Sequence, residues 1–88
     1  MKEEESAIDF PCDFPIKAFG HDTGDFDELV MQLIQQHAPE VTSDAVRTRP
    51  SRGGRYLAVT VTIRAHSRRQ LDDIYHALTA EERVLFAL

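Results

Sequence analysis

The sequence predicts an α+β fold in which four strands and two helices follow the order β-α-β-β-α-β. Three observations lead to this prediction. Two segments with helical periodicity each follow a segment with strand-like alternation, a glycine-containing hairpin joins the two middle strands, and 88 residues leave room for only one modest core. Hydrophobic residues make up 42% of the chain and charged residues 28%, which indicates an ordinary globular domain rather than a disordered chain.

The first strand and the first helix are predicted by a change of period from two residues to 3.6. Residues 14–20 alternate between apolar and other side chains, as in a half-buried strand. The turn at 20–24 leads to Asp25, which is followed after three residues by Glu28 and so has the spacing of a capping box. Pro39 ends the helix. The apolar face of this helix contains Phe26, Leu29, Val30, Leu33 and Ile34.

The second half of the chain begins with a predicted hairpin. A weakly alternating strand at 44–50 and a clear strand at 56–65 flank a loop at 51–55, where two glycines supply the positive φ that such loops need. Ser67 and Gln70 have capping-box spacing and begin a second helix. The apolar face of that helix contains Leu71, Ile74, Tyr75 and Leu78.

The order of these elements predicts a ferredoxin-like sandwich. Strand-helix-strand crossovers are right-handed, so both helices should cover one face of a four-stranded sheet. The first and third strands should be central, and the second strand and an apolar last strand at 83–88 should form the edges. We expect one domain at 10–88, preceded by a flexible acidic tail at 1–9.

Charge is distributed unevenly along the chain. Residues 1–44 contain eleven acidic residues and two lysines, whereas residues 45–88 contain eight arginines and four acidic residues. Seven of those arginines lie within residues 45–71, which contain no acid. This layout favours a small anion, a nucleic acid or an acidic protein as partner. The alternative is that the basic segment folds beside the acidic one and neutralises it.

The single cysteine and the short apolar runs indicate the cellular compartment in which we expect the protein. Cys12 has no second cysteine with which to form an internal disulfide. The acidic N-terminus lacks the apolar core of a secretory signal, and no apolar run approaches the roughly 18 residues that span a bilayer. We therefore expect a cytoplasmic protein that does not bind membranes.

Two segments are candidate binding sites. The first is the turn that leads into the first helix, where free backbone amides favour a small anion while the neighbouring carboxylates favour an ammonium group. An ordinary glycine turn with a helix cap is the alternative. The candidate ligand-binding residues are Gly20, His21, Thr23 and Gly24.

The second candidate site is the arginine-rich hairpin with the exposed sheet face beside it. It predicts binding of an acidic protein partner or an anion, with a nucleic acid as the alternative. Against a nucleic acid, the third strand has Thr60 and Thr62 at positions where stacking rings would be expected. The candidate residues are Arg47, Arg49, Arg52, Arg55 and Arg64.

The last strand carries no charge, and an unguarded edge invites pairing with another chain. We therefore predict a homodimer through Val84, Leu85 and Phe86, unless the strand is too short to pair.

No pattern for catalysis or metal binding is found. The four histidines and Cys12 do not have the spacing of metal ligands, so we expect no metal and no cofactor. No nucleophile elbow or phosphate-binding loop is present either, and we expect a protein that is not an enzyme.

Several short motifs resemble the YbeD-like family of small bacterial proteins, over about residues 10–88. The resemblance implies a ferredoxin-like fold close to ACT-type regulatory domains. It also implies a regulatory protein that binds lipoate. Together with the lack of catalytic groups and the contrast between the basic and the apolar edge, it leads us to expect a non-enzymatic regulatory or adaptor domain that binds a small metabolite related to lipoate or a protein partner. The motifs are Phe10-Pro11, Phe14-Pro15-Ile16-Lys17, His37-Ala38-Pro39, Arg49-Pro50-Ser51, Gly54-Arg55-Tyr56, Val59-Thr60-Val61-Thr62-Ile63 and Gln70-Leu71-Asp72-Asp73-Ile74-Tyr75.

Overall fold

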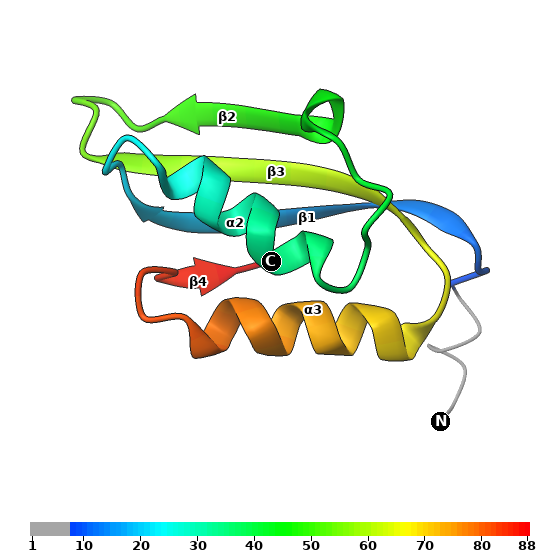
Figure 1. The fold of residues 1–88 in the computed structure, drawn as a ribbon. Helices are drawn as coiled ribbons and strands as arrows, with labels where there is room; N and C mark the ends of the chain where they lie inside the picture. The colour runs from blue at the N-terminus through cyan, green and yellow to red at the C-terminus, as the bar shows by residue number, and fades with distance from the viewer. Residues whose placement is uncertain (1–7) are drawn as a thin grey trace.

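The computed structural model describes residues 8–88, so most of the tail predicted at 1–9 lies outside the described residues. The predicted order of elements is confirmed (Figure 1). The elements are β1 (Cys12–His21), α2 (Phe26–Gln35), β2 (Val46–Pro50), β3 (Tyr56–Ala65), α3 (Arg68–Ala80) and β4 (Phe86–Ala87), with a 3-10 turn at Ser43–Ala45 before β2.

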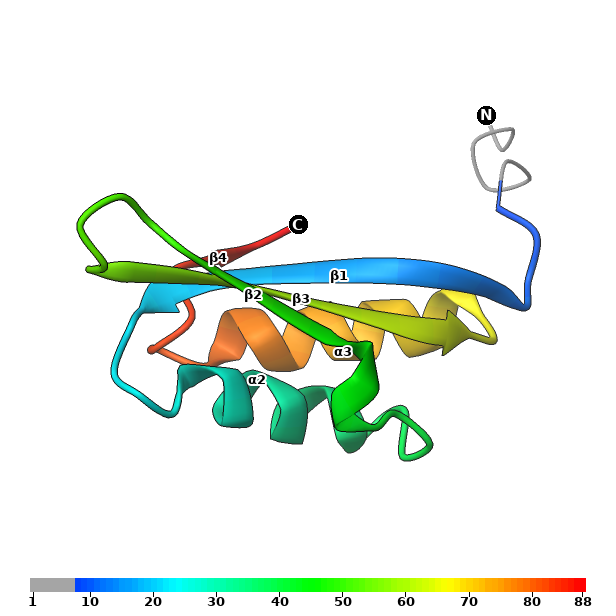
Figure 2. The same cartoon turned by 90° about the horizontal axis from the view of Figure 1, so that it is seen from above.

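The four strands form one sheet in the order β2-β3-β1-β4, and every neighbouring pair is antiparallel. The central and edge strands are therefore those predicted. Both helices lie on one side of the sheet, and no element of residues 8–88 covers its other side (Figure 2). This is the ferredoxin-like α+β fold.

A ten-residue ladder between β1 and β3 forms the middle of the sheet. Its register runs from Cys12 opposite Ala65 to His21 opposite Tyr56. Successive side chains of a strand point to opposite faces, and residues paired across strands share a face. This register therefore determines which side chains face the helices and which face away from them.

Pro15 lies inside β1 without costing a ladder bond to β3. The backbone N–H of Lys17 donates to the carbonyl of Leu88 at 3.0 Å, and the N–H of Leu88 donates to the carbonyl of Lys17 at 2.8 Å. The backbone groups of Lys17 thus face β4, and those of Pro15, two residues earlier, face the same way. The pairing of β4 with β1 does not reach Pro15, so its missing N–H leaves no partner unsatisfied.

The helix side of the sheet and the apolar faces of both helices form the core. It combines residues at the alternating strand positions and on the predicted helix faces with residues from the connections, whereas the predicted Leu29, Leu33 and Tyr75 are only partly buried. Buried apolar side chains are Ile16, Ala18, Phe26, Val30, Ile34, Ala38, Val41, Val59, Val61, Ile63, Ala65, Leu71, Ile74, Leu78 and Val84.

The last strand is shorter than the predicted span of 83–88. The N–H of Val84 donates to the carbonyl of Glu81 at 3.0 Å, so the chain is still in a turn there. Val84 consequently points into the core and is 7% exposed. The chain becomes extended only from Leu85, whose N–H donates to the carbonyl of Phe19 at 2.7 Å.

Of the two predicted capping boxes, the one at α3 forms at its N-cap, while its return bond goes to the residue before Ser67. The N–H of Gln70 donates to Ser67 Oγ at 3.1 Å, and Gln70 Oε1 accepts the N–H of His66 at 2.7 Å. The prediction for α2 is wrong, because Asp25 occupies the N-cap position but accepts no backbone N–H with its side chain. No helix of residues 8–88 is long and apolar enough to cross a membrane.

Gly20 lies where β1, α2 and the loop before β4 meet. A Cβ at this position would come within 2.5 Å of the Phe26 ring and 2.6 Å of the backbone oxygen of Arg83. Phe26 is fully buried, and the oxygen belongs to the backbone, so neither neighbour can move away freely. Glycine is therefore required here by close packing rather than by turn geometry.

We predict that Gly20→Ala lowers the free energy of unfolding by about 1–3 kcal/mol, because the added methyl group overpacks this junction. Urea denaturation of the single variants and of Gly20→Ala/Phe26→Leu measures the coupling. The smaller Leu side chain should recover part of the loss. A Gly20→Ala variant as stable as the wild type would contradict this account.

Candidate functional site

The side of the sheet that faces away from the helices is the candidate functional site, and we call it the open face. Ile16 and Ala18 are buried against the helices, so Lys17 and Phe19 point to the open face. Cross-strand pairing then assigns the remaining members. The open face contains Asp13, Pro15, Lys17, Phe19 and His21 of β1, Arg47 and Arg49 of β2, Tyr56, Ala58, Thr60, Thr62 and Arg64 of β3, and Phe86 of β4.

A hollow of about 520 Å³ lies on the open face between β2 and β1. Its floor is β3, where the small side chains of Ala58 and Thr60 leave space between the longer ones on either side. Three cations border it, and no acidic residue does. The lining residues are Lys17, Phe19, Arg47, Thr48, Arg49, Ala58 and Thr60.

Two aromatic pairs lie on the same face beside the hollow. The rings of Phe19 and Phe86 are stacked, with centroids 4.4 Å apart and planes at 15°. The rings of His21 and Tyr56 lie 4.9 Å apart at 36°. Phe86 and Tyr56 remain 52% and 40% exposed, so each pair presents ring surface to solvent.

The cations of the hollow are not neutralised by carboxylates within residues 8–88. Arg47 Nη1 donates to the backbone carbonyls of Asp44 and Val46, at 3.2 and 3.3 Å. Among the ion pairs within residues 8–88, none includes Arg47, Lys17 or Arg49. The hollow is therefore a locally positive site on a chain whose net charge is −5.

The five predicted arginines do not form one cluster. Arg47 and Arg49 border the hollow, whereas Arg52 and Arg55 are exposed in the hairpin loop beyond it. Arg64 lies near the other end of β3 and pairs with Asp13 at 3.2 Å. About 30 Å of strand separates the two ends of β3, so Arg64 and the hairpin cannot contact one small ligand together.

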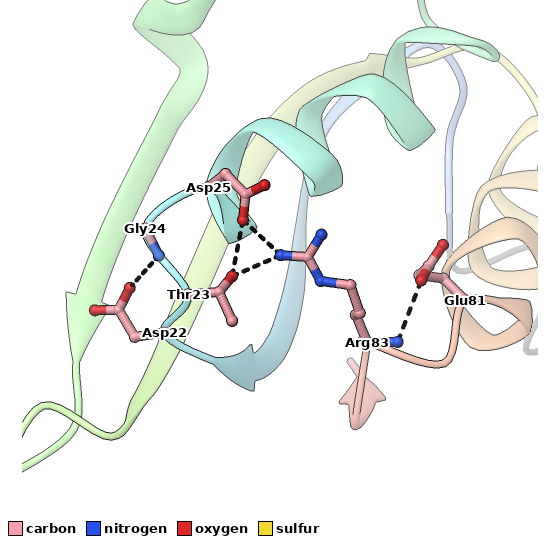
Figure 3. Close-up of polar contacts among 6 residues, drawn as sticks. All are labelled: Asp22, Thr23, Gly24, Asp25, Glu81 and Arg83. Atoms are coloured by element: carbon pink, nitrogen blue, oxygen red, sulfur yellow. Dashed lines mark hydrogen bonds and ion pairs between the residues drawn. The ribbon is translucent and has the colours of Figure 1, made fainter.

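The predicted ligand-binding turn forms a polar network with the loop before β4 (Figure 3). Arg83 Nη2 donates to Thr23 Oγ1 and to Asp25 Oδ1, both at 2.6 Å, and the Thr23 hydroxyl donates to the same carboxylate oxygen at 2.8 Å. The N–H of Gly24 donates to Asp22 Oδ1 at 3.3 Å. This network joins β1 and α2 to the segment that carries β4.

The four residues predicted for that turn do not converge on one point. Gly20 is buried against Phe26, and His21 lies on the open face beside Tyr56. Thr23 takes part in the Arg83 network, and Gly24 provides a positive φ of 89°. A ligand site at this turn remains a prediction.

A second groove, of about 460 Å³, lies between α2 and β2 on the helix side. This groove has an acidic border, because Asp27 and Glu28 lie at its α2 side, whereas the hollow on the open face has a basic border. The lining residues are Asp27, Glu28, Met31, Gln32, Ser43, Val46 and Thr48.

The predicted dimer edge is only partly available. Leu85 and Phe86 are 51% and 52% exposed, but Val84 is in the core and cannot take part in an edge contact. The Tyr75 hydroxyl donates to the carbonyl of Leu88 at 2.8 Å and helps to hold this segment on α3. Dimerisation through Leu85 and Phe86 remains a prediction.

The titratable groups of residues 8–88 do not gather into a metal site: no three His, Cys, Asp or Glu side chains of that range lie together as ligands. His66 Nε2 lies 3.7 Å from Glu40 Oε2 on the surface. Cys12 is half-buried as a free thiol at the start of β1.

Comparison with known proteins gives the family. Residues 5–88 match the family model DUF493, described as "Protein of unknown function". The chain belongs to this family. The match is consistent with the YbeD-like resemblance and covers the whole of the sheet and both helices.

Relatives in several bacteria are similar over nearly the full chain. A UPF0250 protein of Paraburkholderia phytofirmans is 50% identical over 96% of this chain and 94% of its own. The UPF0250 protein NMA1380 of Neisseria meningitidis serogroup A is 39% identical over 100% of this chain and 97% of its own. The solution structure of protein HP0495 from H. pylori has a TM-score of 0.73 at 11% identity, covering 92% of this chain and 85% of that one, which shows the shared fold.

Phe19 and Tyr56 are the two rings that sequence reasoning offered for stacking, whereas Lys17 and the pairing of these rings with Phe86 and His21 were not assigned. The alternation of the first strand predicted that Lys17 and Phe19 share a face, and that of the third strand predicted the face of Tyr56. Their convergence with Phe86 depends on the registers that join β4 and β3 to β1, which no local pattern in the sequence specifies.

The hydrogen bond from Arg83, followed by that from Thr23, holds the pKa of Asp25 below its ordinary value of 3.8. A carboxylate whose pKa is lowered on folding stabilises the folded state at every pH above its ordinary pKa. This contribution to stability is lost as the pH falls through the lowered pKa. We predict that wild type is more stable than Asp25→Asn near neutral pH, and that the difference shrinks as pH falls below about 4.

Chemical denaturation between about pH 7 and pH 2.5 measures this difference. Arg83→Gln should reduce the same pH dependence, and the Asp25→Asn/Arg83→Gln double variant should lose less stability than the sum of the two single variants. A constant difference between wild type and Asp25→Asn over the whole range would show that this ion pair does not contribute.

Proposed function

We propose that this protein is a non-enzymatic regulatory or adaptor domain that holds an anionic partner on the open face of its sheet. The observation that carries the proposal is the hollow bordered by Lys17, Arg47 and Arg49 without an acidic residue. The net negative chain repels anions over most of its surface, whereas the locally positive hollow attracts them.

The geometry indicates what such an anion should carry. Lys17 lies on β1 and the arginines on β2, with β3 between them, so the two sides of the hollow are separated by about 10 Å. A partner that contacts both sides needs either several negative charges or one charge and an extended body. The stacked rings of Phe19 and Phe86 offer an apolar or planar group a surface beside these cations.

Two kinds of partner share this chemistry. An acidic segment of another protein would place carboxylates on both sides of the hollow. A small metabolite with a carboxylate and an apolar body, such as the lipoate that the family resemblance suggests, would place its charge on Lys17 or Arg49 and its body on Phe19. Both agree with a domain that binds its partner without converting it.

We predict that Lys17→Glu/Arg49→Glu weakens anion binding by about tenfold or more, because one cation on each side of the hollow becomes a repelling charge. Isothermal titration calorimetry with lipoate, an oligoglutamate peptide and heparin measures the loss. The matched control is Arg68→Glu/Arg69→Glu, which makes the same change of net charge at exposed positions at the start of α3, away from the open face.

Equal binding by the two double variants would show that the open face is not the site. Failure of wild type to bind any anionic probe would exclude the proposal itself. Turnover of a bound compound that depends on one side chain of the hollow would contradict the non-enzymatic role.

The predicted homodimer is tested separately by sedimentation equilibrium. We predict a dimer that dissociates on Leu85→Lys/Phe86→Lys, because two lysines at an edge oppose strand pairing. A wild-type monomer at high concentration would exclude pairing through β4.

A further inference from the structure

We infer that the anionic partner of the open face is a single-stranded nucleic acid, whose unpaired bases stack on the exposed rings while its phosphates contact the cations of the hollow. This inference rests on the proposed function, because it uses the same face, and it names the class of partner.

The rings are the observation that separates a nucleic acid from other anions. An acidic peptide needs cations, and these alone would explain Lys17, Arg47 and Arg49. An acidic peptide as partner does not account for the two pairs of rings on the same face, in which Phe86 and Tyr56 are 52% and 40% exposed. Bases stack on aromatic side chains with little dependence on sequence, because every base has a planar face.

The two ring pairs are spaced for bases that are splayed apart. Phe19 and His21 are about 7 Å apart along β1, and their partner rings lie on opposite sides of that strand, so the two pairs are separated by at least this distance. This is about twice the 3.4 Å rise per nucleotide of a stacked strand. Neighbouring bases that occupy both pairs must therefore be unstacked from each other, as they are in single-stranded segments bound by proteins.

One cation lies in the same cross-strand row as the Phe19 and Phe86 rings, and the other two lie in the neighbouring row. Arg49, Ala58, Phe19 and Phe86 form one row across the sheet. Arg47, Thr60 and Lys17 form the next. The small side chains of Ala58 and Thr60 leave the hollow over β3 open for a sugar-phosphate backbone, with bases directed to the rings on the β1 and β4 side.

The structure also removes the objection raised by Thr60 and Thr62. Rings need not come from the middle of β3, because β1, β4 and the hairpin end of β3 supply them here. Some RNA-binding domains are built on a four-stranded sheet, and in these domains two or three bases stack on aromatic side chains of the sheet face. Two ring pairs match that number.

The test is fluorescence anisotropy with a labelled oligouridine of about six nucleotides at about 50 mM and 200 mM salt. Three phosphate contacts predict a slope of log K against log salt of about −2, and Arg49→Gln should reduce its magnitude by about 0.7. Phe86→Leu and Tyr56→Leu should each weaken binding at least about fivefold, because they remove a stacking ring. Phe14→Leu makes the same change on the helix side and should leave affinity within about twofold of wild type.

The outcomes separate this inference from the proposed function. Binding of oligoglutamate but not oligouridine, sensitive to Lys17→Glu/Arg49→Glu, overturns the inference and supports the proposed function. The inference is also overturned if Phe86→Leu and Tyr56→Leu bind oligouridine as tightly as wild type does. It is likewise overturned if a duplex of the same length binds as tightly as oligouridine, because bases in a duplex are not free to stack on the rings. Absence of binding to every anionic probe overturns both.

Discussion

The antiparallel ladder between β1 and β3 is the constraint on which the rest of the structure depends. Its ten pairs fix the face of every side chain on the two central strands. A slip of one residue would bring Lys17 and Phe19 under the helices and expose Ile16 and Ala18. The burial of apolar side chains against α2 and α3 therefore selects the register, and the same register brings cations and rings together on the open face.

The two edge strands depend on this ladder in different ways. β2 extends it through its register with β3 and contributes Arg47 and Arg49 to the open face. β4 is only two residues long and is held by few backbone bonds, so the burial of Val84 and the Arg83 network add to its attachment. The close packing at Gly20 completes this attachment, because the backbone of Arg83 lies directly against it. Phe86 therefore depends on contacts far from the hollow for its position beside Phe19.

Local patterns in the sequence were sufficient for the fold but not for the site. Strict alternation at 56–65 predicted β3 with its bounds, and Ser67 with Gln70 predicted the start of α3, because both signals act within a few residues. Asp25 had the same local signal but forms no side-chain cap, and its carboxylate instead accepts a hydrogen bond from Arg83, 58 residues away. The arrangement of the candidate site residues likewise depends on contacts between distant parts of the chain. Arginines that are close in sequence, such as Arg49 and Arg52, separate in space, while Lys17 joins Arg47 only through the sheet.

The central claim is that partners contact the open face and leave the helix side untouched. NMR titration with a short oligouridine and an oligoglutamate peptide tests it most directly, because matched side chains report on each face. Our account predicts shifts in the methyl signal of Ala58 and the ring signals of Phe86, with little change at Ala18 and Phe26, which are buried on the helix side. Shifts confined to the helices, or to the groove between α2 and β2, would contradict it.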